Sequence, residues 1–107
     1  MHRLPPALAA TATPRILDLL GDGPGRVLEL GFAGIHAYFL ELSGWDVEVL
    51  EPDPAQAARA HERGARVVER PAGSYDAVVA PSDADLNGID AAKIILVDER
   101  GIASIAG

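Results

Sequence analysis

Three short apolar runs constrain the fold of this chain more than any other feature of its sequence. They lie at residues 26–30, 75–80 and 93–97, and each places apolar residues on successive positions. A strand with one solvated face alternates apolar and polar residues, whereas a strand covered on both faces reads as an apolar run. The runs therefore predict a parallel sheet that is buried on both faces.

Segments with helical character separate these runs. A helix is expected to begin at Thr13-Pro14 and another at Asp53-Pro54, with Thr13 and Asp53 as capping residues and each proline at the first helical position. A third helix, at 35–43, is expected to place Ile35, Phe39 and Leu42 on one stripe.

Two further strands are expected at 45–50 and 65–69, and a turn at 98–101 returns the chain as a strand at 102–105. Strands that alternate with helices indicate an α/β domain with right-handed crossovers and an antiparallel edge. Residues 1–11 are expected to form a loose N-terminal arm.

The composition of the chain excludes several kinds of binding partner and chemistry. The 107 residues suffice for one domain, 1–107, and carry a net charge of −7 with no basic stripe, so neither nucleic acid nor an acidic membrane is an expected partner. No cysteine is present, which excludes disulfides, cysteine-ligated zinc and thiol nucleophiles. Since the N-terminus lacks a signal-peptide core and no apolar run reaches membrane-spanning length, we expect a cytoplasmic protein.

The segment from Val27 to Pro54 carries the residues best suited to binding a ligand. A strand leads into a tight turn, Gly31 to Gly34, with small residues at 31, 33 and 34, and Glu51 stands at the carboxyl end of the next strand. Small residues let a ligand approach the backbone, and the helix that follows offers free N–H groups. A carboxylate at the end of the second strand can accept hydrogen bonds from two ribose hydroxyls.

This arrangement resembles the class I S-adenosylmethionine-dependent methyltransferases, whose first signature is an acidic residue followed by Gly-x-Gly-x-Gly. Glu29 and Gly31 match its start, Ala33 stands where the second glycine usually is, and Ile35 replaces the third, with Gly34 between them. Residues 51–54 are similar to the family's ribose-binding turn, and 74–79 resemble the segment that leads into its fourth strand.

The resemblance covers about residues 13 to 100 and implies a three-layer Rossmann-like domain. It also implies a parallel sheet of order 3-2-1-4-5 with an antiparallel C-terminal edge strand.

The same resemblance implies S-adenosylmethionine as cofactor. Glu29 would sit near its methionine end, Gly31 and its neighbours beneath it, and Glu51 at the ribose hydroxyls, while Glu69 is the nearest acidic candidate for the adenine pocket. The expected cofactor-binding residues are Glu29, Gly31, Ala33, Gly34, Glu51, Pro52 and Glu69. The sequence indicates neither a catalytic residue nor a metal site.

Each of these residues also has a structural interpretation. Glu29 can cap nearby N–H groups, Gly31 and Gly34 can simply tighten a strand–helix connection, and Glu51 can form part of a turn. We expect His36 on the surface and Tyr38 partly buried. The acidic loop of Asp83, Asp85, Asn87 and Asp90 has the position of an acceptor or general-base site, and we expect it to be solvated.

The predicted function is S-adenosylmethionine binding, with methyl transfer to an acceptor that the sequence does not identify. The alternative is a degenerate, non-catalytic member that binds a nucleoside ligand or acts as a protein-interaction module. Ile35 in the turn and the short C-terminal part favour this alternative. A dinucleotide-binding module ranks last, because its fingerprint requires glycines at 31, 33 and 36. The apolar strand at 102–105 leaves an open edge, which suggests a homodimer through this edge or through the helices.

Overall fold

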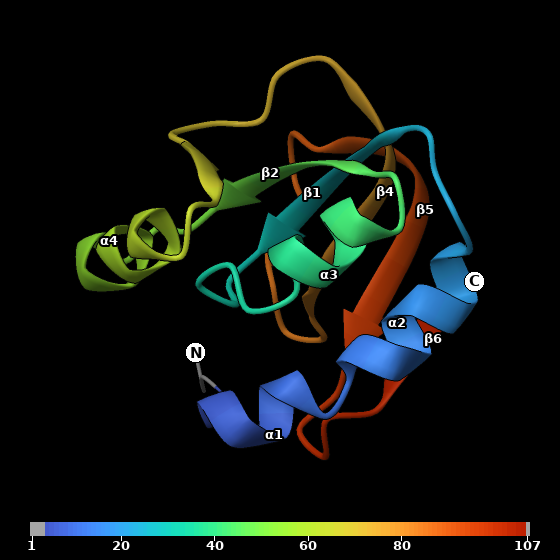
Figure 1. Ribbon diagram of the computed structural model, residues 1–107, viewed down its shortest axis with the longest axis horizontal. Helices are drawn as coiled ribbons and strands as arrows, with labels where there is room; N and C mark the ends of the chain where they lie inside the picture. Colours follow the sequence, from blue (N-terminus) through green and yellow to red (C-terminus); the bar gives the residue numbers. More distant parts are fainter. Residues whose placement is uncertain (1–3, 107) are drawn as a thin grey trace.

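The computed structural model describes residues 4–106, which form a six-stranded sheet with helices packed against it (Figure 1). The helices are α1 (Pro6–Ala10), α2 (Thr13–Leu20), α3 (Ala37–Leu42) and α4 (Pro54–Glu62). The strands are β1 (Arg26–Leu30), β2 (Asp46–Leu50), β3 (Arg66–Val68), β4 (Ser74–Pro81), β5 (Asp90–Val97) and β6 (Ala103–Ile105).

The strand order is β3-β2-β1-β4-β5-β6, and every neighbouring pair is parallel except β5 and β6. In the centre of the sheet Val27 lies beside both Val47 and Ala77. The expected α/β class, the 3-2-1-4-5 order and the antiparallel edge are thus confirmed. No helix in the described part of the chain is long and apolar enough to span a membrane.

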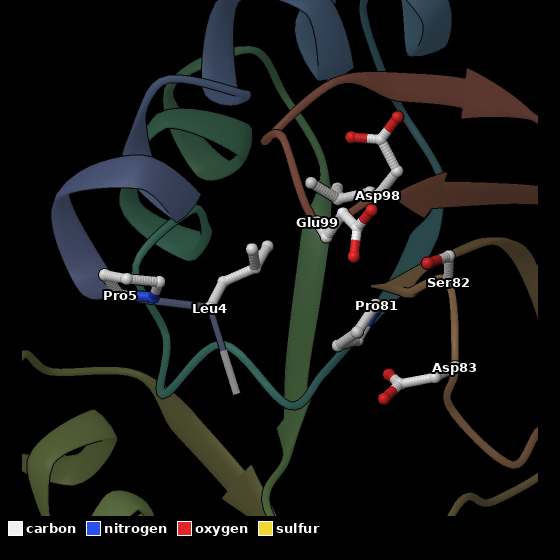
Figure 2. A pocket seen from close by; sticks show the side chains of 8 residues that line it. Leu4, Pro5, Pro81, Ser82, Asp83, Asp98 and Glu99 are labelled. Atoms are coloured by element: carbon white, nitrogen blue, oxygen red, sulfur yellow. The ribbon is translucent and has the colours of Figure 1, made fainter. Parts of the chain in front are cut away.

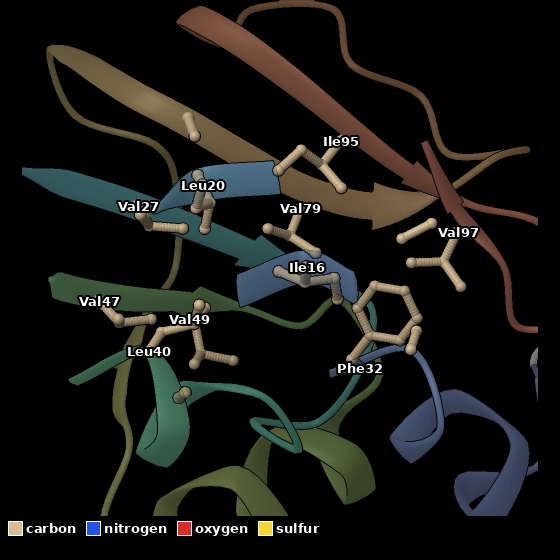
Figure 3. Packing of buried hydrophobic residues seen from close by; sticks show 14 of the residues in the cluster. Ile16, Leu20, Val27, Phe32, Leu40, Val47, Val49, Val79, Ile95 and Val97 are labelled. Carbon is tan, nitrogen blue, oxygen red and sulfur yellow. The ribbon is translucent and has the colours of Figure 1, made fainter. Parts of the chain in front are cut away.

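The helices share one face of the sheet. Ile16 of α2 and Leu40 of α3 are fully buried in the main hydrophobic cluster, against strand residues such as Val79 and Ile95 (Figure 3). Ala9 of α1 and Ala60 of α4 belong to the same cluster. Burial of these side chains in close contact with the strands stabilises the helical layer.

Loops cover the opposite face, where the three-layer expectation placed helices. Leu86 and Ile89, from the 82–89 connection, pack against a second cluster of Leu28, Tyr75 and Val78. The 69–73 and 82–89 crossovers are shorter than the dozen or more residues that helical crossovers usually need. The third layer is therefore made of loop, and the domain keeps its helices on one side.

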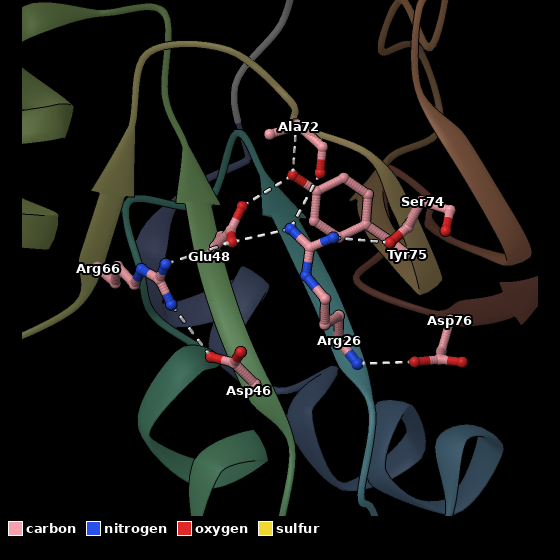
Figure 4. Close-up of polar contacts among 8 residues, drawn as sticks. All are labelled: Arg26, Asp46, Glu48, Arg66, Ala72, Ser74, Tyr75 and Asp76. Atoms are coloured by element: carbon pink, nitrogen blue, oxygen red, sulfur yellow. Dashed lines mark hydrogen bonds and ion pairs between the residues drawn. The ribbon is translucent and has the colours of Figure 1, made fainter.

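The 69–73 crossover contains no helix, and a network of polar side chains fixes its backbone (Figure 4). Arg26 donates from Nη1 to the carbonyl of Ser74 at 2.8 Å, and from Nη2 to the carbonyl of Ala72 at 3.0 Å and to Glu48 at 2.9 Å. The Tyr75 hydroxyl donates to Glu48 at 2.8 Å and accepts from the Ala72 N–H at 3.0 Å. Glu48 is 5% exposed, so this network supplies its carboxylate with the partners that a buried charge requires.

The N-terminal part of the chain differs from expectation in two places. Residues 6–10 of the expected loose arm form α1, whose Ala9 is buried, while residues 1–3 of the arm lie outside the described residues. Thr13 does not cap α2, because its hydroxyl lies 2.7 Å from His36 Nδ1 and Ala12 takes the cap position. The expected cap at Asp53 is confirmed by a 3.0 Å bond from the Ala55 N–H.

Helix α3 begins two residues later than expected, at Ala37. Residues 33–36 form turns instead, with Ala33 and Gly34 in the left-handed region at φ 53° and 77°. The helix consequently buries Ala37 and Leu40 and exposes Phe39 and Leu42, which the sequence had placed on the packing stripe.

The network on the loop-covered face gives a first prediction. Tyr75→Phe removes the hydroxyl that serves both Glu48 and Ala72, and we expect the free energy of unfolding to fall by about 1–3 kcal/mol because buried polar groups lose their partner. Tyr38→Phe is the matched control, since Tyr38 is 61% exposed, and should change stability by less than about 0.5 kcal/mol. Urea denaturation measures both, and equal effects would contradict this role for Tyr75.

Candidate functional site

Three pockets lie along the carboxyl edge of the sheet. The strand order reverses between β1 and β4, and ligands of open α/β sheets bind at the carboxyl edge near such a point. The β1–β2 pocket, about 240 Å³, is lined by Leu30, Gly31, Glu51, Pro52, Asp53, Pro81, Ala84 and Asp85. The β4–β5 pocket, about 350 Å³, is lined by Leu4, Pro5, Pro81, Ser82, Asp83, Val97, Asp98 and Glu99 (Figure 2). The α1–α4 pocket, about 160 Å³, is lined by Leu4, Pro6, Ala9, Gly31, Phe32, Ala33, Ile35, Gln56 and Arg59.

The pockets are neighbours, because single residues border two of them at once. Pro81 lines the β1–β2 and β4–β5 pockets, and Gly31 lines the β1–β2 and α1–α4 pockets. A Cβ on Gly31 would stand 3.3 Å from the Pro81 ring. The absence of a side chain at position 31 therefore leaves the edge open between β1 and β4.

The turn after β1 is held from two sides. Ala33 has φ 53°, a left-handed conformation that costs a non-glycine residue about 1–2 kcal/mol. Its N–H donates to Glu51 at 3.3 Å, and its carbonyl accepts from Arg63 at 2.6 Å. The backbone at the family's second glycine position thus keeps a glycine-like conformation although alanine occupies it.

Glu51 stands at the carboxyl end of β2, as the sequence predicted, and is 6% exposed. Besides the Ala33 N–H, its carboxylate accepts from the Asp53 N–H at 3.4 Å. Glu51 also lines the β1–β2 pocket, next to Gly31 and Pro52. Glu51 therefore combines a structural contact with a position suited to a ligand's hydroxyl groups.

Glu29 serves the turn instead of a pocket. Its side chain is completely buried, Oε1 accepts from the His36 N–H at 2.8 Å, and it lines none of the three pockets. Burial raises the pKa of Glu29 to about 7, although the N–H groups of His36, Gly34 and Ala37 lower it. The structure thus gives Glu29 the capping role that the sequence left open as an alternative to a cofactor contact.

His36 is buried, contrary to the expected surface position. Its Nδ1 lies 2.7 Å from the Thr13 hydroxyl, and the Phe32 ring packs edge-on with ring centroids 4.8 Å apart. Burial lowers the pKa of His36 to about 4, so the imidazole is neutral near neutral pH. Tyr38, expected to be partly buried, is 61% exposed because α3 begins later than predicted.

The remaining predicted residues divide into two groups. Pro52 joins Gly31 and Glu51 in the β1–β2 pocket, and Ala33 lines the α1–α4 pocket. Gly34 packs against Ala60 and Ala65, where an added Cβ would come within 3.3 Å, and Glu69 is exposed in the 69–73 crossover away from these pockets.

Several residues that line the pockets carry no signal in the sequence. Leu4 and Pro5 come from the segment expected to be loose, and Asp98 and Glu99 come from the turn before β6. Asp83 and Asp85, of the acidic loop, line the β4–β5 and β1–β2 pockets respectively, so that loop does border the site. Across the described residues no group of three or more His, Asp or Glu side chains could hold a metal ion.

Comparison with known proteins establishes the fold. No family model matches the chain, and no curated protein matches its sequence. Among solved structures, the glycopeptide N-methyltransferase MtfA matches with a TM-score of 0.56 and 22% sequence identity over 77% of this chain and 42% of that chain. The chain thus has a methyltransferase-like Rossmann fold and spans less than half the length of this structural relative.

Glu29 and His36, both fully buried, give opposite pH dependences of the free energy of unfolding. Glu29 keeps its proton up to about pH 7 in the folded state but releases it near 4.5 when unfolded, so its contribution to stability falls as pH rises through this window. His36 binds its proton near 6.5 when unfolded and only near 4 when folded, so its contribution rises with pH.

Glu29→Gln removes the first effect and leaves the second. We expect the free energy of unfolding of the variant, relative to the parent, to rise by on the order of 2 kcal/mol between about pH 5 and about pH 8. Denaturant titrations across this pH range measure the difference in free energy of unfolding. For the control variant Glu69→Gln, at an exposed position, this difference should not change with pH. A pH-independent difference for Glu29→Gln would disprove the burial argument.

Proposed function

We propose that the carboxyl edge of the sheet binds S-adenosylmethionine and that the chain is a methyltransferase-like protein. The observation that carries this proposal is the β1–β2 pocket, where Glu51 stands beside the side-chain-free Gly31 at the point where the strand order reverses. Leu30, Pro52, Pro81 and Ala84 offer apolar surface to a base, and Glu51 offers a carboxylate to ribose hydroxyls.

The charge of the lining favours this cofactor over a dinucleotide. Glu51, Asp53 and Asp85 line the β1–β2 pocket, and Arg59 is the only basic residue among the described residues that line the three pockets. A pyrophosphate would meet like charges there, whereas S-adenosylmethionine carries a sulfonium cation and no phosphate. The acidic lining of the pocket therefore fits a nucleoside without phosphates.

The β4–β5 pocket is the proposed place for the acceptor, because it shares Pro81 with the β1–β2 pocket. When bound, the cofactor supplies an electrophilic methyl group. The chain's own residues have to hold the acceptor in line with that group. Asp83, Asp98 and Glu99 line this pocket without a basic residue, so they suit an acceptor with amine or hydroxyl donors and exclude anionic ones.

One observation favours the non-catalytic alternative. Glu29, the acidic residue that the resemblance placed near the methionine end, is buried beneath the turn. A protein that binds a nucleoside without transferring a methyl group would be consistent with this burial. Neither Phe32 nor Ile35 lines the β1–β2 pocket, however, so the altered turn does not close that pocket.

Calorimetric titration tests the proposal. We expect S-adenosylmethionine and S-adenosylhomocysteine to bind and NAD to give no heat. Glu51→Gln should weaken binding at least about tenfold, or about 1.4 kcal/mol, because one neutral amide oxygen replaces a carboxylate at the ribose.

Glu69→Gln is the matched control and should bind like the parent, because Glu69 lines none of the three pockets. Asp85→Asn removes a negative charge from the loop side of the β1–β2 pocket and leaves the turn after β1 unchanged. It therefore shows whether the loss of a negative charge by itself weakens binding. Absence of heat with all ligands from well-folded parent protein would refute the proposal.

A further inference from the structure

The three pockets at the carboxyl edge of the sheet meet in pairs. Gly31 lines both the β1–β2 and the α1–α4 pocket, and Pro81 lines both the β1–β2 and the β4–β5 pocket. Leu4 completes the set, because it lines the β4–β5 pocket (Figure 2) and the α1–α4 pocket. A ligand whose three arms branch from one atom can therefore reach all three pockets, and the chemistry of each lining decides which arm it receives.

The linings differ in charge. Three carboxylates line the β1–β2 pocket and three others line the β4–β5 pocket. The α1–α4 pocket has no carboxylate among the described residues that line it, and its one charged side chain there is the cation Arg59. An anionic group is thus repelled from the first two pockets and attracted to the third.

The side chains of α4 suit this third pocket to an amino-acid group. Arg59 is exposed and takes part in none of the ion pairs found among the described residues, which involve Arg26 and Arg66. A guanidinium can hold a carboxylate through two parallel hydrogen bonds. Gln56 lies three residues earlier on α4 and lines the same pocket, where its amide oxygen can accept from an ammonium group.

We propose that Arg59 binds the carboxylate of the amino-acid arm of S-adenosylmethionine in the α1–α4 pocket, with Gln56 at the ammonium group. This assignment rests on the proposed function. Of the three arms on the sulfonium, only the amino-acid arm carries a carboxylate, and the α1–α4 pocket is the one that attracts an anion. The resemblance placed Glu29 near this end of the cofactor, but Glu29 is buried, and Arg59 supplies a contact from a different element.

Calorimetry with two nucleosides tests the assignment. S-adenosylhomocysteine has the amino-acid arm, and methylthioadenosine is a similar nucleoside thioether without it. The parent should bind S-adenosylhomocysteine at least about tenfold more tightly than methylthioadenosine, because only the former can form the charge-assisted bonds. Arg59→Gln should weaken binding of S-adenosylhomocysteine about tenfold and change binding of methylthioadenosine less than about twofold. Arg59→Lys, which keeps the charge without the planar fork, should retain part of the preference.

Arg15→Gln is the matched control, because it removes the same charge from an exposed position on α2 that lines none of the three pockets. It should bind both nucleosides like the parent. If Arg59→Gln weakens both nucleosides equally, or neither, the assignment is wrong while cofactor binding stands. A well-folded parent that binds neither nucleoside would overturn the proposed function and this assignment with it.

Discussion

The buried carboxylate of Glu29 connects the parts of the molecule that shape the candidate site. Glu29 lies on β1 and accepts a hydrogen bond from the His36 N–H, and the His36 ring contacts the hydroxyl of Thr13 on α2. Burying a carboxylate is costly unless it accepts hydrogen bonds, so its position fixes where the turn's N–H groups must lie. In the same turn Ala33 takes the left-handed conformation, and its N–H donates to Glu51 at the end of β2.

A domain with helices on only one face needs another means of covering its sheet. Here the cover on the second face is loop, held by Leu86 and Ile89 from one side and by the Arg26, Glu48 and Tyr75 network from the other. Hydrogen bonds to backbone carbonyls are directional, so they fix a short crossover that has few apolar contacts of its own. At the centre of the sheet β1 pairs with β2 along its whole length and with β4 over residues 27–29, and the ends of these three strands carry the β1–β2 pocket.

The sequence predicts best what depends on local pattern. Continuous apolar runs located the central strands, and Asp53 before Pro54 identified the start of α4, because both signals act within a few residues. The burial of His36 could not be predicted in this way, since it depends on Thr13 and on where the preceding turn ends. The same turn shifted the phase of α3 and reversed the expected exposure of Tyr38. Leu4 gave no signal as a lining residue, because its contact with the β4–β5 pocket arises from packing between distant segments.

At the candidate site, the resemblance assigns both Glu51 and Glu29 to the cofactor, whereas the structure places Glu51 at the β1–β2 pocket and Glu29 in the interior. Both residues are acidic and both follow the expected spacing, but Glu29 points inward from β1 while Glu51 leaves the end of β2 at the pocket. Their positions in the strands differ: Glu29 lies within β1 on the face that packs against the helices, opposite to Leu28, whereas Glu51 lies beyond the last pair of β2 at the carboxyl edge. The acidic lining around Glu51 then limits the ligands that can enter, because every phosphate would approach carboxylates in a chain that is already anionic. The proposed ligand, a nucleoside with a sulfonium cation and no phosphate, would meet opposite charge at this edge.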